Sequence, residues 1–369
     1  MTTTSRTAAR AALPRVRLYE TVRTAHLERA HELAPASIVY RRRRYDFDDD
    51  LARGLDLVEA GPLRAARVLL RSDVRELEIN EPLMVSSLRR TALALAAVDL
   101  RRLLRRPRTL VVTYAIANDD PFRPPARPGL RGRLRRLLDA RLIALVARRV
   151  DRVVLGTPAA QELYAARVPG LLAHAEHVLL PALPTACGCG PLDAHDPDEV
   201  LFVGAFEERK GVPQLLAAWP LVHAARPTAR LTLVGKGPLA DDVHRFAAER
   251  PEVTVVVDPP RPQVHARQRR AAVAVLLSQR TRTWREQVGL PVVEGLAHGC
   301  AVLTTTETGL ASWLREHGHG VVEPTAAPAD VAAALLALLD RRRPAADVLA
   351  DLPDVDGRLA ADTWLLRAR

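Results

Sequence analysis

Two glutamates, Glu286 and Glu294, stand eight positions apart in the segment WREQVGLPVVEGLAHGCAVLTT. Between them Gly289 precedes Pro291, and proline is favoured in the first turn of a helix. We therefore expect Glu286 in a loop before a helix and Glu294 about one turn inside that helix. The amides of Gly289 and Leu290 would then point to where an anion binds a helix N-terminus.

This spacing suits a ligand that carries both phosphates and hydroxyls, such as a sugar diphosphate. Glu286 would accept hydrogen bonds from sugar hydroxyls, the helix start would hold phosphate, and Glu294 would accept from both ribose hydroxyls. The simpler interpretation is two surface glutamates beside a turn, and the spacing alone favours it.

Lysine is rare in this chain, because only Lys210 and Lys236 stand among the 54 basic residues. A lysine ammonium is a compact charge that suits a single phosphate oxygen. Lys210 follows Arg209 in the segment EERKGVPQLL, which places two cations side by side for an anionic ligand. Lys236 stands in GKGP, a pattern more typical of a tight turn with an exposed lysine.

Apolar segments alternate with amphipathic helical patterns along the chain, which indicates βα units, parallel sheets and the α/β class. The 369 residues are enough for two domains. We expect a domain over 1–183, a linker over 184–199, a second domain over 200–356, and a closing helix over 357–369 that returns to the first domain. Strands are expected at 16–20, 37–41, 77–80, 109–114, 152–156, 176–180, 200–204, 230–235, 253–257, 273–278 and 300–305. The main helices are expected at 85–105, 132–150, 212–225, 239–249, 263–272 and 291–298.

The excess positive charge lies in the first half of the chain. Residues 1–190 hold 33 arginines against 20 acidic residues, whereas the whole chain has a net charge of +11. Such a surplus indicates an acidic ligand, an anionic membrane, or simply an arginine-rich composition. Aromatic residues make up 4% of the chain, too few for the stacking surfaces of single-strand binders, so we expect no nucleic-acid partner. No secretory signal or spanning segment is expected, which predicts a cytoplasmic protein.

No metal centre is expected from the sequence pattern. Cys187, Cys189 and Cys300 are too few and too oddly spaced for a disulfide framework or a zinc site, so all three are interpreted as reduced thiols. Asp48-Asp49-Asp50 follows a run of arginines in a polar stretch, which favours solvated charges. His317 and His319 flank a glycine, which favours a turn.

Four blocks of the second half together resemble the retaining glycosyltransferases of family 4. They are VLFVGAFEERKGVPQLLAAWP from Val200, LTLVGKGPL from Leu231, the glutamate run described above, and GLASWLREHGHGVVEP from Gly309. The last residues, DTWLLRAR, resemble the closing helix of that family. The resemblance implies a GT-B fold, in which two Rossmann-like domains face a central cleft.

The resemblance also implies an activity: transfer of a sugar from a nucleoside diphosphate sugar to an acceptor hydroxyl, with retention and without a metal or other cofactor. It implies catalytic roles for Lys210, Arg209 and Glu286. The residues implied to bind the donor are Gly204, Gln287, Val288, Gly289, Leu290 and Glu294. Ala205 stands where the family commonly has arginine, and Arg209 is expected to supply that charge.

The first half resembles the family less closely. Asn80 and Glu81 stand where many members have His-Glu, and the glycine-rich loop after the first strand is missing. We expect Asn80 and Glu81 to contact the donor sugar or the acceptor. Tyr114, Asn118 and Asp119 follow a strand and would line the acceptor site, or they form an ordinary capped loop.

Two other interpretations remain open. The departures at Asn80, Ala205 and the missing loop fit an inactive binding or partner subunit of GT-B shape. The basic helix near 130–150 fits peripheral contact with an anionic membrane. We prefer a domain helix whose leucines, Leu134, Leu138, Leu142 and Leu145, face the core.

Overall fold

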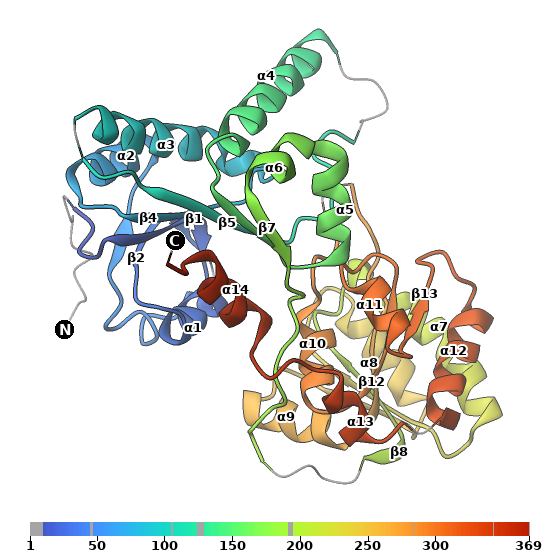
Figure 1. Cartoon of the computed structure of the whole chain (residues 1–369). Coiled ribbons are helices and arrows are strands. Elements are labelled where there is room, and N and C mark those ends of the chain that lie inside the picture. The colour runs from blue at the N-terminus through green and yellow to red at the C-terminus, as the bar shows by residue number, and fades with distance from the viewer. Residues whose placement is uncertain are drawn as a thin grey trace. The chain divides into compact units, whose positions relative to one another are not determined.

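The computed structural model describes residues 10–44, 47–104, 106–123, 129–190, 195–282, 284–341 and 343–368. The chain forms two compact units (Figure 1). The N-terminal unit comprises Met1–Gly156, Ala160–Leu180 and Arg358–Arg369, and the C-terminal unit comprises Thr157–Ala159 and Pro181–Gly357.

The N-terminal unit is built on a seven-stranded parallel sheet with the order β3-β2-β1-β4-β5-β6-β7. Its strands are β1 (Arg15–Val22), β2 (Ser37–Arg43), β3 (Leu57–Glu59), β4 (Glu76–Ile79), β5 (Leu110–Ala115), β6 (Arg152–Leu155) and β7 (Glu176–Leu179). Its helices are α1 (Thr24–Glu32), α2 (Pro62–Arg71), α3 (Leu88–Leu103), α4 (Leu130–Ala147), α5 (Pro158–Arg167), α6 (Pro169–His174) and α14 (Gly357–Leu365). A short 3₁₀ turn, Val85–Ser87, replaces the start of the helix expected at 85–105, and Arg105 lies outside the described residues.

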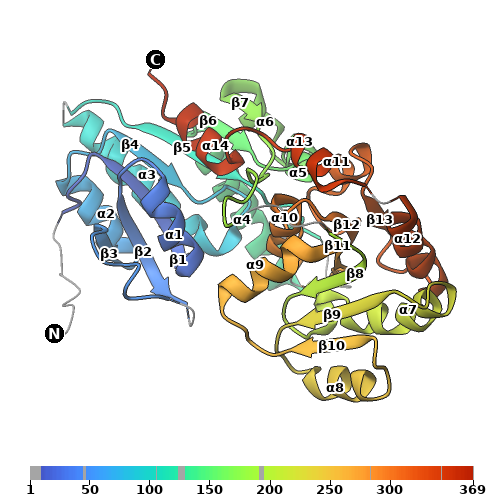
Figure 2. The same ribbon diagram turned by 90° about the horizontal axis from the view of Figure 1, so that it is seen from below.

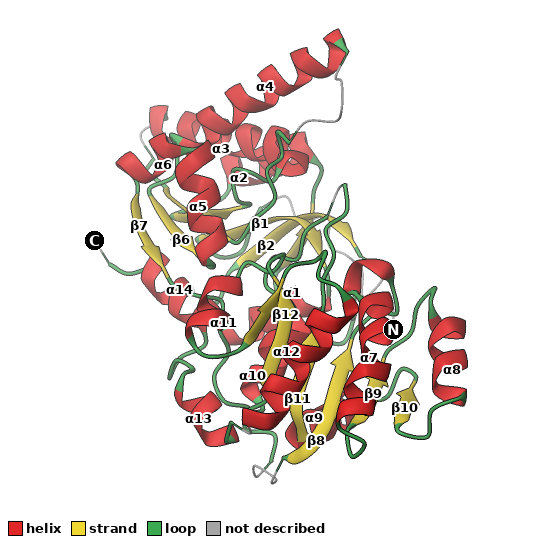
Figure 3. Cartoon of the chain, turned by 90° about the vertical axis from the view of Figure 1, so that its right-hand side faces the viewer, coloured by secondary structure: helices red, strands yellow, loops and turns green. Residues whose placement is uncertain are grey.

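The C-terminal unit has a six-stranded parallel sheet with the order β10-β9-β8-β11-β12-β13, shown in yellow in Figure 3. Its strands are β8 (Asp196–Val203), β9 (Arg230–Val234), β10 (Val253–Val256), β11 (Ala271–Leu276), β12 (Ala301–Thr305) and β13 (Gly320–Val322). Its helices are α7 (Val212–Ala225), α8 (Ala240–Ala248), α9 (Arg261–Arg270), α10 (Leu290–Ala297), α11 (Ala311–Glu316), α12 (Pro328–Arg341) and α13 (Ala345–Ala350). Figure 2 shows β10 at the edge of this sheet, beside α8.

Parallel strands form here because both faces of each sheet are covered by helices, so the strands are almost continuously apolar. Val200, Leu231, Val273 and Val302, from four neighbouring strands of the C-terminal sheet, are all fully buried. Each sheet reverses its order beside its first strand, as in doubly wound folds, and ligands of such sheets bind beyond the carboxyl ends of the strands at this switch point.

Strand β8 begins four residues before the predicted start at Val200, inside the predicted linker. Its first residues are polar, so the hydrophobic pattern did not predict this part of the strand. They are held in the sheet because Arg230 of the neighbouring strand β9 pairs with both Asp196 and Glu199. Residues 191–194 of the predicted linker lie outside the described part of the chain.

The expectation that one leucine face of the helix near 130–150 packs into the core is wrong for most of its length. Leu134, Leu138 and Leu145 are 59%, 48% and 53% exposed, and Leu142 is half-buried. Only Ile143, Val146 and Ala147 of α4 are buried, because the helix reaches the core with its C-terminal part alone. Figures 1 and 3 show the rest of α4 standing out from the N-terminal unit.

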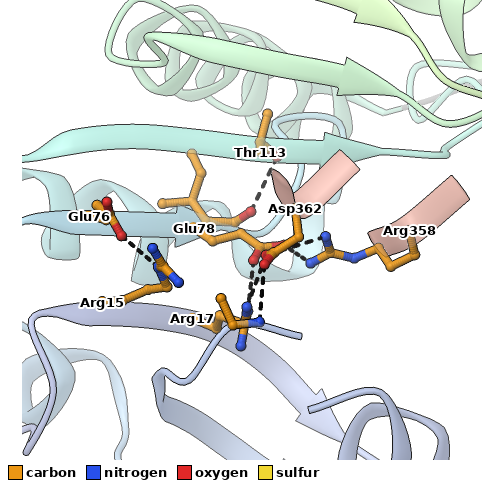
Figure 4. Close-up of polar contacts among 9 residues, drawn as sticks. Arg15, Arg17, Glu76, Glu78, Thr113, Arg358 and Asp362 are labelled. Carbon is orange, nitrogen blue, oxygen red and sulfur yellow. Dashed lines mark hydrogen bonds and ion pairs between the residues drawn. The ribbon is translucent and has the colours of Figure 1, made fainter. Parts of the chain in front are cut away.

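Helix α14 is fixed to the N-terminal sheet by apolar and ionic contacts. Ala361 and Leu365 pack against Val112 of β5 and Val154 of β6. Arg17 bridges Glu78 of β4 (3.1 Å) and Asp362 of α14 (2.9 Å), and all three side chains are buried (Figure 4). Arg358 donates to the other oxygen of Glu78 at 2.5 Å. Burial would raise the pKa of Glu78, but the two arginines hold it below its ordinary value.

Candidate active site

The central strands of the C-terminal sheet, β8 and β11, lie next to each other and point the same way. Gly204 directly follows the first of them, and Ser278 follows the second after one residue. These two loops therefore leave the sheet at its switch point, where a ligand of a doubly wound sheet is expected. The loops carrying Lys210 and Glu286 continue from these same two strand ends.

Lys210 reaches this edge because of the glycine that follows it. Gly211 has a φ of +75°, and a Cβ at this position would overlap the carbonyl oxygen of Leu277, at the end of β11. The backbone amide of Gln279 donates to the carbonyl of Arg209 at 2.9 Å. The short 3₁₀ turn Glu208–Lys210 is therefore attached to the end of the neighbouring strand.

The side chains of Lys210 and Glu286 meet in an ion pair. The distance from Lys210 Nζ to Glu286 Oε2 is 2.5 Å, and both side chains are largely buried, at 14% and 11% exposure. The hydroxyl of Ser278 donates to the same carboxylate oxygen at 3.1 Å. Sequence analysis predicted separate roles for Lys210 and Glu286, and the structure shows that they act on each other.

An aromatic ring covers the two cations of this loop. The guanidinium of Arg209 and the ammonium of Lys210 lie 4.7 and 5.0 Å from the ring centroid of Trp284. Arg209 also pairs with Glu207 at 2.5 Å, so a carboxylate of its own loop already balances its charge. Lys236, by contrast, is 68% exposed and paired with the exposed Asp258, as expected for a turn lysine.

The loop between the two predicted glutamates ends at the N-terminus of α10. Gly289 occupies its N-cap position with a φ of +79°, a conformation that other residues adopt only with strain, and Pro291 lies in the first turn. The carbonyls of Gln287 and Val288 are held by the Gly309 amide (2.9 Å) and the Thr308 hydroxyl (3.0 Å). The side chain of Gln287 and that of Leu290 are exposed.

Glu294 lies one turn into α10 and is half-buried. Its Oε2 is 3.5 Å from Nε2 of Gln268, a buried residue of α9. Two glycine turns complete this edge of the sheet: a Cβ on Gly235, after β9, would overlap the carbonyl of Gly204, after β8. Gly235 therefore excludes a larger residue, and the two turns pack backbone against backbone.

The predicted polar residues of the N-terminal unit lie after β4 and β5. Asn80 Oδ1 accepts from the Glu20 amide at 3.3 Å, and its buried Nδ2 has no partner among the described residues. Glu81 Oε2 accepts from the amides of Ile116 (3.1 Å) and Ala117 (2.9 Å) and from the Tyr164 hydroxyl (3.2 Å). Burial raises the pKa of Glu81 to about 7 in spite of these donors.

The three residues predicted around the loop after β5 lie in different surroundings. Tyr114 belongs to β5 itself, and its ring lies under the guanidinium of Arg358 of α14, 5.0 Å from the centroid. Asn118 is buried, with 3% exposure, and Asp119 is half-buried. Their role in binding an acceptor stays a prediction.

Sequence reasoning missed two contributors to the site, Ser278 and Trp284. A polar residue at the end of the apolar strand predicted at 273–278 was the signal for Ser278, and an aromatic residue two positions before Glu286 was the signal for Trp284. It also missed a group of four possible metal ligands in the C-terminal unit, Cys187, Cys189, His265 and His298. The structure brings these residues together from three separate segments, which sequence spacing does not show.

Residues 197–341 match the family described as "Glycosyl transferases group 1". Residues 197–341 therefore form a group 1 glycosyltransferase domain within the chain. The matched range includes β8 to α12 and therefore Lys210, Glu286 and Glu294. Sugar transfer is accordingly the chemistry of the enzyme.

Several solved structures share the fold of this enzyme over more than nine-tenths of the chain. The apo form of the lipopolysaccharide outer core galactosyltransferase WaaB has a TM-score of 0.63 at 12% identity, covering 93% of this chain and 96% of that chain. Anabaena Alr3699/HepE in complex with UDP has a TM-score of 0.61 at 12% identity, with 95% of each chain covered. The trehalose-6-phosphate synthase OtsA has a TM-score of 0.61 at 12% identity, covering 96% and 99%. The fold is therefore GT-B, as the sequence resemblance implied.

No curated protein sequence matches this glycosyltransferase. Among the described residues, no helix has the length and apolar character needed to cross a membrane.

Proposed function

We propose that this enzyme is a retaining glycosyltransferase that takes a sugar from a nucleoside diphosphate sugar and needs no metal ion for the transfer. The observation that carries this proposal is the Lys210–Glu286 ion pair at the switch point of the C-terminal sheet, in the loop that leads to the N-terminus of α10. The solved structures of Alr3699/HepE with UDP and with UDP-glucose support the same donor class.

The chemistry follows from where charge develops. When the bond between the anomeric carbon and the phosphate oxygen breaks, negative charge grows on the leaving diphosphate. Lys210 and the N-terminal amides of α10 stabilise that charge, because fixed donors in a partly dry site lower the barrier most. Glu286 holds the ammonium in place and accepts from a sugar hydroxyl, while Glu294 accepts from the ribose.

Retention then needs no protein base. The acceptor hydroxyl attacks the anomeric carbon on the face that the diphosphate leaves, a new carbon–oxygen bond replaces the old one, and the leaving phosphate oxygen takes the hydroxyl proton. We assign the acceptor to the N-terminal unit, where the buried Asn80 Nδ2 is available as a donor beyond β4.

The deciding experiment is a panel of nucleotide sugars tested by thermal shift and then by transfer or hydrolysis. A ligand present at about 100 times its dissociation constant adds about 2.7 kcal/mol to stability, which a melting curve resolves. The sugar product should keep its anomeric configuration by NMR. If no nucleotide or nucleotide sugar binds by calorimetry, the chain is an inactive partner subunit instead.

Metal independence requires a separate measurement. The enzyme is passed over a chelating resin, its metal content is measured, and turnover is compared with and without added Mg²⁺ or Mn²⁺. We expect no stimulation, and a strict requirement for either ion would contradict the proposed mechanism.

Contact with an anionic membrane is a second part of the proposal, and the exposed face of α4 favours it. Leu130, Leu134, Leu138 and Leu145 are 48–83% exposed on a helix that also carries arginines and one aspartate. Basic helices with exposed leucines bind the interface of anionic bilayers. The protein should sediment with vesicles containing phosphatidylglycerol but not with pure phosphatidylcholine, and Leu134→Glu should abolish the difference.

A further inference from the structure

Four side chains of the C-terminal unit converge away from the proposed donor site. The ligand atoms of Cys187, Cys189, His265 and His298 all lie within 4.8 Å of one another. The two cysteines come from the segment before β8, His265 comes from α9, and His298 is the C-cap residue of α10. Residues up to 111 positions apart thus form one cluster of two thiols and two imidazoles.

One contact within the cluster already has the dimensions of a metal centre. Cys189 Sγ lies 3.3 Å from Nε2 of His298. With zinc–sulfur bonds of about 2.3 Å and zinc–nitrogen bonds of about 2.0 Å, tetrahedral ligands stand about 3.5 Å apart. The widest pair has to close by about 1 Å, a movement within reach of side-chain rotation.

The surroundings of His298 are those of a metal ligand. Its Nδ1 is 2.7 Å from the backbone carbonyl of Glu294, so this nitrogen carries the proton and Nε2 presents a lone pair toward Cys189. Metal-bound histidines are typically oriented by such a bond from the second nitrogen. The ring of His265 packs edge-on against that of His298, with centroids 5.0 Å apart.

A backbone contact at Cys187 and a side-chain contact at Cys189 hold the two cysteines in place. The amide of Cys187 donates to the carbonyl of Ala297 at 2.8 Å, and Nη1 of Arg269 donates to Cys189 Sγ at 3.1 Å. Nε2 of His195 lies 3.1 Å from the backbone carbonyl of His298. The segment before β8 is therefore already docked on the end of α10.

We propose that Cys187, Cys189, His265 and His298 bind one zinc ion. Two thiolates and two imidazoles in a tetrahedral arrangement favour Zn²⁺ among the divalent metals, and two thiolates balance its charge. With all four positions filled by protein, the ion is structural rather than catalytic. It ties the segment before β8 to α9 and to the C-terminal end of α10.

Two helices, α9 and α10, connect the proposed zinc site to the proposed donor site. Helix α9 carries both His265 and Gln268, whose amide approaches Glu294, and α10 carries Glu294 one turn before His298. Zinc at the far end of α10 would fix the position of Glu294 without touching the ligand. The zinc site itself stands independently of the proposed donor chemistry.

The test measures metal, not transfer. The full chain is purified under reducing conditions, and zinc is determined by plasma mass spectrometry, with about one ion per chain expected. Cobalt substituted into the metal-depleted protein should give the intense visible bands of a tetrahedral thiolate centre. Loss of a residue that only hydrogen-bonds to a metal ligand lowers metal affinity by roughly tenfold or more. Cys189→Ser and His265→Gln each remove a ligand itself, so each should weaken zinc binding by at least that factor.

Matched control variants show whether zinc binds at this cluster or at other cysteines and histidines of the chain. Cys300→Ser alters the buried third cysteine, whose thiol donates to the Gln268 carbonyl, and His244→Gln alters an exposed histidine of α8. Both variants should bind zinc as the wild type does.

Cys189 is exposed, so its replacement by serine leaves the fold intact and the comparison valid. Equal zinc binding by Cys189→Ser and wild type, or a Cys187–Cys189 disulfide in the reduced preparation, would overturn the proposal.

Discussion

Lys210 and Glu286 are 76 residues apart in the chain, yet Nζ of one lies 2.5 Å from Oε2 of the other. The pair forms where the loops after β8 and β11 leave the sheet side by side. Because both side chains are largely buried, neither charge can be removed without leaving the other uncompensated. The pair thus links the cation that would face a leaving phosphate to the carboxylate that would face the sugar.

Replacing Lys210 should slow transfer, beyond the stability that is lost when Glu286 is left without its partner. We expect Lys210→Met to lower kcat by roughly 100-fold or more, because one fixed charge is removed from the developing diphosphate. Lys236→Met is the matched control, since it removes the chain's other lysine, which is exposed and paired with Asp258. Steady-state kinetics and circular dichroism of both variants check this, and equal losses would place the reaction elsewhere.

The two glutamates should separate in their kinetic effects. Glu294→Ala should weaken binding of the bare nucleoside diphosphate in calorimetry, because only the ribose contact is lost. Glu286→Ala should chiefly lower kcat, because it removes both the sugar contact and the partner of Lys210. Nucleotide binding unchanged in both variants would show that the donor lies away from α10.

Gly211 should be indispensable for this edge of the sheet. Its φ of +75° costs other residues about 1–2 kcal/mol, and its Cβ would overlap the carbonyl of Leu277. We therefore expect Gly211→Ala to destabilise the C-terminal unit by about 2 kcal/mol or more in denaturant unfolding. Gly170→Ala is the control, because nothing lies within 4 Å of a Cβ at that position of α6 and its φ is not positive.

Much of the fold was predictable because apolar strands and helical periodicity are local properties. The strands that begin at Ser37, Arg152 and Glu176 were predicted from their first residue. The GT-B fold was implied by the resemblance of four blocks of the second half to a known family, and such blocks are also local. Strand β8 was misplaced because its polar start is stabilised by Arg230, a partner on another strand.

The rest depends on contacts between distant segments. The leucines of α4 have helical periodicity, but only the tertiary structure shows that most of them are exposed. The convergence of Cys187 and Cys189 with His265 and His298 is hidden for the same reason: C-x-C lacks the spacing of common zinc motifs, and the histidines lie on two other elements. Ion pairs such as Arg17 with Asp362 join opposite ends of the chain and have no local signal.

Removing Asp362 should release α14 from the N-terminal unit. Asp362 is buried and pairs with Arg17, so Asp362→Ala leaves a buried guanidinium with one partner fewer. The expected loss is about 3 kcal/mol in the unfolding of that unit. Asp354→Ala is the control, because Asp354 is exposed. Faster proteolysis after residue 356 in Asp362→Ala alone would confirm the detachment, and identical protease resistance would contradict it.

The last prediction concerns pH and follows from Glu81. Burial raises its pKa from 4.5 to about 7. Between these two pH values the Glu81 carboxyl is therefore protonated in the folded protein and ionised in the unfolded chain. Stability must therefore fall as pH rises through this window, since the unfolded state binds fewer protons than the folded state. Integrated from about pH 5 to about pH 8, the loss is about 2 kcal/mol.

Glu81→Gln keeps the shape of the side chain and cannot ionise, so the variant should lack this part of the pH dependence. Chemical unfolding of both proteins at several pH values measures it, and the difference between their stabilities should grow with pH. Parallel pH profiles for wild type and Glu81→Gln would show that Glu81 is already ionised when folded. In that case the amides of Ile116 and Ala117 and the Tyr164 hydroxyl, which all donate to Oε2, would outweigh the cost of burial.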